Sequence, residues 1–210
     1  DTLYRMGQYL GRIHAIGAIS PFKHRENLSV ISQLATDLAY LYDHFIPKDL
    51  RPAHQSLGDD LIRAIEQRIA NRVAAPALRL HGDCHAGNVL WRDDKPWFLD
   101  FDDCLNGPAI QDLWMLLWGD HAEQAQQLAE IRDGYNEFNT FDASQLGWIE
   151  ILRTRRMVRQ AAWIGRRWSD PAFPLAFTWF NDARYWPQHI LQLREQLAAL
   201  REAPLALWPS

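Results

Sequence analysis

The sequence predicts a mainly α-helical domain with one small β-hairpin near its middle. Apolar residues recur every three or four positions before about residue 75 and again after Pro108, the spacing that places them on one face of a helix. Between these helical regions, two short β-prone runs flank an Asp-rich turn, a pattern typical of a hairpin. We therefore expect helices to build most of the core, and the polar residues that crowd the hairpin to carry the function.

Composition narrows the class of protein. The chain has 210 residues, of which 48% are hydrophobic and 23% charged, which is the balance of one globular domain over residues 1–210. A formal net charge of −4 argues against binding to nucleic-acid phosphates. No apolar run approaches the roughly 18 residues of a membrane span, and Cys84 and Cys104 are too few for a disulfide scaffold. We expect a cytoplasmic protein with neither nucleic-acid nor membrane partners.

Three helices are expected in the first third of the chain. They cover residues 4–17, 28–45 and 55–72, and each ends at or before a glycine or proline. A short apolar run, Leu78–Leu80, leads directly into a polar segment that begins at His81.

The hairpin and the later helices follow in order. Its expected strands are Val89–Trp91 and Pro96–Asp100, joined by the turn Arg92–Lys95. The helical period returns after Pro108, and further helices are expected over residues 121–138, 143–168, 172–184 and 188–201.

Two further features of the later helices are open to a structural or a functional interpretation. Six arginines lie between Arg153 and Arg167; they predict a solvated helix face paired with acidic residues, and alternatively a surface for an acidic partner. Tryptophans at helical spacing are expected to pack in the core or against another lobe: Trp114, Trp118, Trp163, Trp179 and Trp186.

Three polar residues near the hairpin stand out: Asp83, Asn88 and Asp100. Asn88 precedes the first strand and Asp100 ends the second, so antiparallel pairing puts both at the same end, with Asp83 in the loop leading to it. Asn and Asp oxygens suit Mg²⁺, which takes few protein ligands. A further carboxylate nearby can accept a proton from an attacking hydroxyl. This arrangement serves phosphoryl transfer.

A structural interpretation of the same residues is that Asp and Asn are common in turns, so a lone Asp-x-x-x-x-Asn pair would carry little weight. The complete pattern is far more specific. It consists of His81-Gly-Asp83, Asn88 five residues later, and an apolar hairpin that ends in Leu99-Asp100-Phe-Asp.

This pattern resembles the aminoglycoside phosphotransferase and choline kinase superfamily, which has the protein-kinase fold. His81–Asn88 is similar to the catalytic loop of that superfamily, Phe98–Asp103 to its metal-binding segment, and Pro108–Leu113 to the start of the following helix. Where the family often has Leu-His-Pro, this chain has Cys84-His-Ala, which removes no chemical group. The amino-acid sequence of Arg79–Trp118 most resembles that of bacterial Ser/Thr protein kinases of the stress response.

The resemblance implies a role for each of these residues. Asp83 would be the catalytic base, while Asn88 and Asp100 would hold Mg²⁺ and thereby the phosphates of ATP. His81 and Asp112 would support the loop structurally. The implied cofactors are Mg²⁺ and ATP, and the implied partner is a protein with a Ser or Thr hydroxyl, with a small-molecule hydroxyl (aminoglycoside, choline or homoserine) as the alternative.

Such kinases also need an upper lobe with a phosphate-covering loop and a strand lysine. The chain contains no Gly-x-Gly-x-x-Gly, and Lys23, Lys48 and Lys95 are expected in connecting segments or the hairpin turn. We therefore expect these residues to form the C-terminal lobe of a kinase whose N-terminal ATP-binding lobe lies outside the chain. We expect the chain alone to bind ATP weakly.

Two other function classes compete with a kinase. His81-x-Asp83-x-His85 superficially resembles a metallophosphoesterase loop, although the remaining histidines do not form the further ligand pairs of a binuclear site. A non-catalytic kinase-like scaffold is the other, and the presence of Asp83, Asn88 and Asp100 together argues against it.

Overall fold

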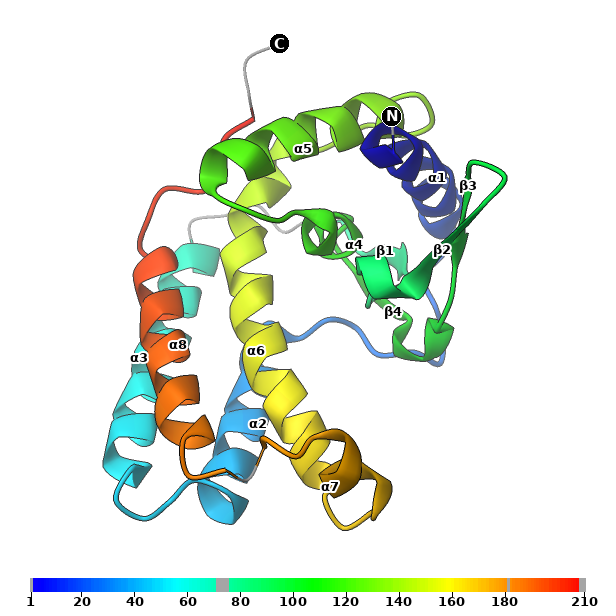
Figure 1. Ribbon diagram of the computed structural model, residues 1–210. Coiled ribbons are helices and arrows are strands. Elements are labelled where there is room, and N and C mark those ends of the chain that lie inside the picture. The colour runs from blue at the N-terminus through cyan, green and yellow to red at the C-terminus, as the bar shows by residue number, and fades with distance from the viewer. Residues whose placement is uncertain (1, 71–75, 181, 208–210) are drawn as a thin grey trace. The chain divides into compact units, whose positions relative to one another are not determined.

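The computed structural model describes residues 2–70, 76–180 and 182–207, and these form two compact units (Figure 1). Unit 1 contains the described residues among 1–28, 73–149 and 204–210. Unit 2 contains those among 29–72 and 150–203. Most of the described chain is helical, with two small antiparallel sheets, which confirms the predicted fold class.

In unit 1, helices α1 (Thr2–Gly17) and α5 (His121–Tyr135) lie against each other (Figure 1). The contact is close because glycines face the partner backbone: a Cβ on Gly7 would overlap the carbonyl oxygen of Ile131, and one on Gly134 would overlap that of Tyr4. This close packing places the apolar stripe of α1, which ends in the buried His14, in the interior of unit 1.

Unit 1 holds two two-stranded sheets where the sequence predicts a single hairpin. Strand β1 (Leu78–Leu80) pairs with β4 (Leu105–Gly107), and β2 (Val89–Arg92) pairs with β3 (Lys95–Phe98). The side chains of β1 and β4 pack with Ala109 and Leu28 into a small apolar cluster. The sequence therefore missed the β1–β4 pair, because its strands are three residues long and far apart in the chain.

The boundaries of the β2–β3 hairpin also differ from the prediction. Strand β3 ends at Phe98, two residues before Asp100, and Lys95 is its first residue rather than part of the turn. Asp93 and Asp94 form the tight turn with positive φ, a conformation that Asp tolerates better than most residues. Asp100 thus lies in the loop that follows the strand.

Short helices connect the sheets of unit 1 to α5 and to unit 2. Helix α4 (Ile110–Leu113) continues as the 3₁₀ helix η3 (Trp114–Leu116), and η4 (Ala143–Trp148) precedes α6. The predicted helix over 143–168 is therefore a 3₁₀ helix in its first six residues.

The secondary structure of unit 2, in the residues described, consists of helices. They are α2 (Val30–His44), α3 (Arg51–Ala70), α6 (Ile149–Arg166, which starts at the last residue of unit 1), α7 (Ala172–Ala176) and α8 (Tyr185–Ala199). The helix expected over 172–184 is only α7; the chain then turns, with aromatic side chains such as Phe180 filling the interior. The last residues of the expected helix 55–72, residues 71 and 72, lie outside the described part.

The arginines of α6 make contacts within unit 2. Arg166 pairs with Asp37 at 2.6 Å, Arg153 lies 3.2 Å from Glu150, and Arg155 donates to Gln33 at 2.8 Å. These contacts support the interpretation of a helix face paired with polar neighbours.

Of the tryptophans predicted to pack in the core or against another lobe, Trp114 and Trp186 are buried. Trp118, Trp163 and Trp179 are exposed and therefore do not occupy core positions of this chain, so for these three the contact with another lobe stays a prediction. In the described ranges, no helix is both long and apolar enough to cross a membrane.

Candidate active site

The loop that carries Asp83 begins with a turn that only glycine fits. Gly82 has φ +87°, and a Cβ there would overlap the backbone oxygen of Asp103. Glycine permits both the left-handed backbone and the close approach. The chain can therefore leave β1 at His81 and turn sharply so that Asp83 follows at the rim of unit 1.

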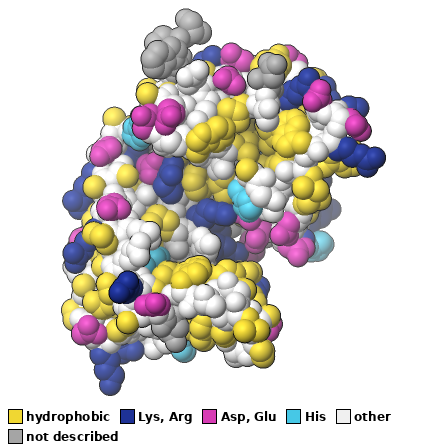
Figure 2. All heavy atoms as spheres, in the orientation of Figure 1, with side chains coloured by type: hydrophobic (Ala, Val, Ile, Leu, Met, Phe, Trp, Pro, Cys, Tyr) yellow, Lys and Arg dark blue, Asp and Glu magenta, His cyan; other side chains and the backbone are white. Residues whose placement is uncertain are grey.

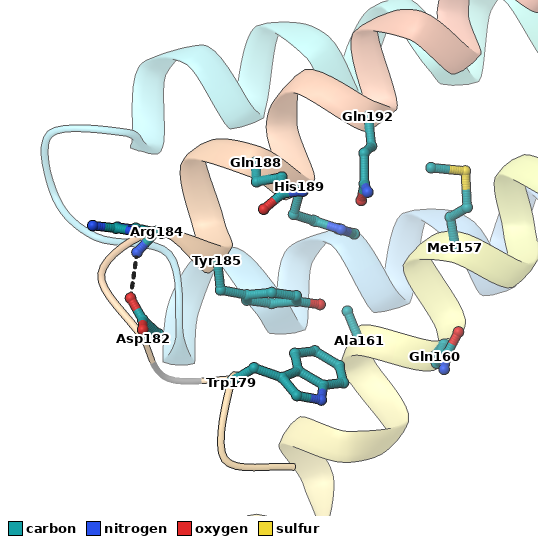
Figure 3. Close-up of a pocket in the computed structure, with 10 residues that line it drawn as sticks. All are labelled: Met157, Gln160, Ala161, Trp179, Asp182, Arg184, Tyr185, Gln188, His189 and Gln192. Atoms are coloured by element: carbon teal, nitrogen blue, oxygen red, sulfur yellow. Dashed lines mark hydrogen bonds between the residues drawn. The ribbon is translucent and has the colours of Figure 1, made fainter.

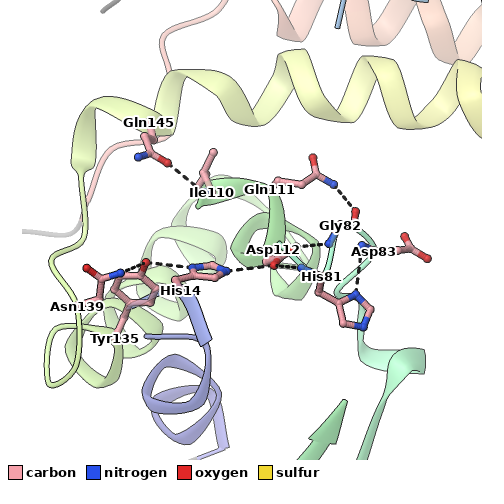
Figure 4. Close-up of polar contacts among 10 residues, drawn as sticks. All are labelled: His14, His81, Gly82, Asp83, Ile110, Gln111, Asp112, Tyr135, Asn139 and Gln145. Atoms are coloured by element: carbon pink, nitrogen blue, oxygen red, sulfur yellow. Dashed lines mark hydrogen bonds and ion pairs between the residues drawn. The ribbon is translucent and has the colours of Figure 1, made fainter. Parts of the chain in front are cut away.

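Asp112 holds this turn through its buried carboxylate. Its Oδ2 accepts from the backbone N–H of His81 and its Oδ1 from that of Gly82, both at 2.8 Å (Figure 4). The neighbouring Gln111 donates from Nε2 to the Gly82 carbonyl at 2.8 Å. Helix α4 therefore pairs both sides of the turn, and its buried backbone groups are satisfied.

A chain of buried hydrogen bonds supports Asp112 in turn. His14 of α1 contacts Asp112 Oδ2 through Nε2 at 3.1 Å, and because a carboxylate only accepts, Nε2 donates. His14 Nδ1 lies 3.0 Å from the Tyr135 hydroxyl, which accepts from Asn139 Nδ2 at 3.1 Å (Figure 4). Burial raises the pKa of the Tyr135 phenol, so it stays neutral. Helices α1 and α5 are thus joined to the loop.

His81 connects the loop to the end of β3. Its Nε2 donates to the carbonyl of Leu99 at 2.7 Å, and its Nδ1 accepts from the backbone N–H of Asp83 at 3.3 Å. The ring is buried and lies 4.8 Å from the ring of Phe101, measured between centroids. One imidazole therefore fixes the backbone on both sides of the site.

The side chain of Asn88 reaches back to Asp83. Its Nδ2 donates to the Asp83 carbonyl at 3.0 Å and lies 3.4 Å from the carboxylate oxygen Oδ2. His85 Nε2 is also 3.4 Å from that Oδ2, while His85 Nδ1 accepts from the Gly87 N–H at 3.0 Å. His85 therefore has a structural role in the loop and also faces the Asp83 carboxylate.

Asp100 directly follows Leu99, a residue whose backbone is bonded to Asn88. The N–H of Leu99 donates to the Asn88 carbonyl at 2.9 Å, and Val89 pairs with Phe98 in the sheet. Asp100 follows with φ 59° and ψ 70°, and its side chain is exposed. Asp102 and Asp103 are exposed as well, and Figure 2 shows acidic side chains gathered over this turn after β3.

The donor set fits a hard divalent cation. Both hydrogen bonds of the Asn88 amide use its Nδ2, which leaves Oδ1 as the atom available to a metal. With the Asp100 carboxylate it would give two oxygen ligands, the small protein share that Mg²⁺ takes beside phosphates and water. Over the described ranges, no three His, Cys, Asp or Glu side chains gather into a group that could hold a metal ion.

Cys84 lies in the loop next to Asp83, but its thiol does not face solvent. Its side chain is fully buried, and burial, with the nearby Asp112 and Asp83 charges, raises the pKa of the thiol. A thiol in such surroundings is a packing residue.

The structure brings together four of the five residues singled out from the sequence. His81, Asp83 and Asn88 share hydrogen bonds within one loop, and Asp112 of α4 is bonded to the His81 backbone. Asp100 follows Leu99, a residue bonded to both His81 and Asn88. Sequence reasoning missed four contributors: His14, Tyr135, Asn139 and Gln111. For His14 the only signal was a histidine on the apolar face of the first helix.

Comparison with known proteins identifies the family of the chain. A model of the phosphotransferase enzyme family matches residues 1–149. Stress response kinase A of Escherichia coli is 46% identical over all 210 residues. The serine/threonine protein kinase RdoA of Salmonella typhimurium is 44% identical over the same span. The chain spans 63% of the length of each of these relatives.

Solved structures show the same fold at low sequence identity. An amicoumacin kinase, hAmiN, matches 99% of this chain and 61% of its own, with a TM-score of 0.65 and 19% identity. The choline kinase LicA of Streptococcus pneumoniae matches 94% of this chain and 63% of its own, with a TM-score of 0.63 and 11% identity. Both have the kinase-like fold that the loop and hairpin indicate. The chain belongs to the phosphotransferase enzyme family.

Proposed function

We propose that this chain is the catalytic part of an ATP-dependent kinase that phosphorylates Ser or Thr hydroxyls of a protein. The observation that carries the proposal is the hydrogen-bonded loop that places the Asp83 carboxylate beside Asn88, with Asp100 following the residue that both Asn88 and His81 hold. This arrangement supports the proposal because it would supply phosphoryl transfer with a proton acceptor and two oxygen ligands for a divalent cation.

Asp83 would orient the acceptor hydroxyl and take its proton. As the hydroxyl oxygen bonds to the γ-phosphorus, the bond from that phosphorus to the ADP oxygen breaks, and the hydroxyl proton passes to the Asp83 carboxylate. The Asn88 amide near Asp83 Oδ2 limits the rotation of that carboxylate. General-base assistance of this kind contributes roughly 10²- to 10⁴-fold to a rate.

Asn88 and Asp100 would hold the nucleotide through a divalent cation. Bound there, Mg²⁺ would neutralise phosphate charge. The residues themselves supply fixed positions: Asn88 through its bonds to Asp83, and Asp100 through the bonds that Leu99 makes on either side. The resemblance to the kinase superfamily implies that an upper lobe outside this chain would complete the nucleotide site.

The test uses the full-length protein with labelled ATP and protein acceptors. Asp83→Asn removes the proton acceptor and keeps the shape, so we expect kcat to fall roughly 10²- to 10⁴-fold. Asp93→Asn, an exposed residue of the β2–β3 turn, is the matched control and should change kcat less than about twofold. Asn88→Ala and Asp100→Asn should raise the Mg²⁺ concentration needed for half-maximal rate. Full activity of Asp83→Asn would refute the assignment.

A second candidate acceptor, a small-molecule hydroxyl, is favoured by one observation. The structures that share this fold include an amicoumacin kinase and a choline kinase, which are named for small-molecule substrates. The relatives of high identity are instead named as protein or stress response kinases. A panel of amino alcohols and amino sugars in the same assay decides, because transfer to one of them with a higher kcat/KM than to any protein would replace the protein acceptor.

A further inference from the structure

A cavity of about 480 Å³ lies in unit 2, between α6, α8 and the turn that precedes α8 (Figure 3). This volume falls in the range of small-molecule binding sites, roughly 300–1,000 Å³. The residues proposed for phosphoryl transfer do not contribute to its walls, and the inference drawn from it does not depend on the proposed function.

Three glutamine carboxamides face this cavity. Gln188 and Gln192 lie one turn apart on α8, and Gln160 comes from α6 across the cavity (Figure 3). Among the residues that the structure describes, none of the three amides has a hydrogen-bond partner. Each carboxamide offers one acceptor and two donor hydrogens, so opposite walls present matched donor and acceptor groups to whatever enters.

Aromatic rings form another wall. The rings of Trp179 and Tyr185 are 5.0 Å apart between centroids and tilted by 49°, which makes an apolar corner. Tyr185 also stacks on His189 at 5.7 Å, and Figure 3 shows the imidazole between Tyr185 and Gln192. Trp179 is 45% exposed, so the face of its indole can be covered by a ligand.

The cavity carries no net charge near neutral pH. Burial raises the pKa of Tyr185 to about 12, and burial together with the nearby His54 lowers that of His189 to about 4, so both side chains are neutral. The charged lining residues are Asp182 and Arg184, of opposite sign and two positions apart, with the Arg184 N–H donating to Asp182 Oδ1 at 2.8 Å. A charged ligand therefore gains little here over a neutral one.

We propose that this cavity binds a neutral cyclic polyol, one or two sugar rings in size. A hydroxyl group donates and accepts at once, which matches the carboxamides of Gln160, Gln188 and Gln192. The C–H face of a sugar ring is apolar and would pack on the Trp179 and Tyr185 corner. A sugar ring carries hydroxyl groups all around it, so amides on opposite walls can bond to it at the same time. A flat heterocycle has its polar atoms only in the plane of the ring, so fewer of them would meet these amides.

The experiment measures binding to the full-length protein without nucleotide, by titration calorimetry and saturation-transfer NMR. The probes are glucose, galactose and maltose, with adenosine, glucosamine and glucose 6-phosphate as comparisons. We expect at least one neutral sugar to bind. Gln192→Ala should weaken it about three- to tenfold, the loss of one hydrogen bond. Trp179→Ala should abolish the binding, and Trp179→Phe should restore part of it.

Matched controls come from the same unit. Trp163→Ala removes an exposed tryptophan of α6, and Gln55→Ala an exposed glutamine of α3; neither lines this cavity, and neither should change sugar affinity. The proposal is overturned if no neutral sugar binds, if the Gln192 and Trp179 variants bind as the controls do, or if adenosine or a charged sugar binds more tightly than every neutral one. Gln192 is exposed, so Gln192→Ala should leave thermal unfolding unchanged. The Trp179 ring also packs against Phe180 and Tyr185, so if Trp179→Ala unfolds early, Trp179→Phe replaces it in the test.

Discussion

Replacing Asp112 by Asn tests how the loop that carries Asp83 is held. The Asp112 side chain is fully buried and accepts three hydrogen bonds: from the His81 and Gly82 backbones at 2.8 Å each, and from His14 Nε2 at 3.1 Å. Asn keeps the shape but exchanges one accepting oxygen for a donating NH₂. In either amide orientation, at least one backbone N–H must then face another donor.

The magnitude follows from the three contacts. The less costly orientation places the NH₂ at the former Oδ1, so that only the Gly82 N–H loses its acceptor. A hydrogen bond to a charged group is worth about 1.5–3 kcal/mol, and a buried N–H left unpaired costs about 1–3 kcal/mol. The neutral amide also weakens the two remaining hydrogen bonds, because they are no longer made to a charged group. In the other direction, the folded protein no longer has to bury a charge, which recovers part of the lost free energy of unfolding. We expect Asp112→Asn to destabilise unit 1 by about 3 kcal/mol.

Two measurements check this value. Urea unfolding should show a transition at lower denaturant concentration with an unchanged m value, and amide hydrogen exchange should show a faster Gly82 N–H. Asp133→Asn, on the exposed side of α5, is the control and should leave both unchanged. The kcat for phosphoryl transfer should fall as well, because the Asp83 backbone follows directly after Gly82. A slow Gly82 amide and an unshifted transition in Asp112→Asn would refute the reasoning.

Three further outcomes are expected. Gly82→Ala should lower the free energy of unfolding by about 2 kcal/mol or more, since the left-handed backbone and the contact with Asp103 both exclude a Cβ; an unchanged urea transition would contradict this. Iodoacetamide should label the half-buried Cys104 and spare Cys84 in the folded protein, and label both after denaturation, as mass spectrometry would show; early labelling of Cys84 would contradict its burial. Burial lowers the pKa of His54 and His189 to about 4, below the unfolded value of 6.5, so the stability they contribute is complete above pH 6.5 and is lost as the pH falls toward 4. The loss is on the order of 2–3 kcal/mol per histidine, and urea unfolding at several pH values should show that His54→Leu flattens it.

The sequence predicted the helices better than the sheets. Helices α1, α2 and α8 have regular apolar stripes, and their observed bounds lie within a few residues of the predicted ones. Periodicity cannot reveal the β1–β4 pair, because Leu78–Leu80 and Leu105–Gly107 are too short to show alternation and meet only through tertiary structure. The predicted helix 172–184 failed for a related reason: aromatic residues there face the core from a turn rather than from one helical stripe.

The candidate site was predictable where its residues are close in sequence. Asp83 and Asn88 are five positions apart, and the hairpin register brings the residue before Asp100 beside Asn88. The exact end of β3 was not predictable, because Asp100 adopts a left-handed conformation that breaks the strand two residues earlier. The break still leaves Asp100 at the expected end of the hairpin, since the Leu99 backbone remains bonded on both sides.

The support of the loop was beyond the reach of sequence patterns for a physical reason. His14 and Asp112 are 98 positions apart, and each occupies an ordinary buried position of its own helix. A buried carboxylate is stable only if its oxygens are bonded, and the two loop N–H groups occupy it from one side alone. His14 supplies a third donor to Asp112. The Tyr135 hydroxyl satisfies the other nitrogen of His14 and itself accepts from the Asn139 amide. The apolar face of α1 therefore carries a polar residue because Asp112 of α4 requires a further donor. Since His14 is positioned by the packing of α1 against α5, this packing also affects the position of the loop that carries Asp83.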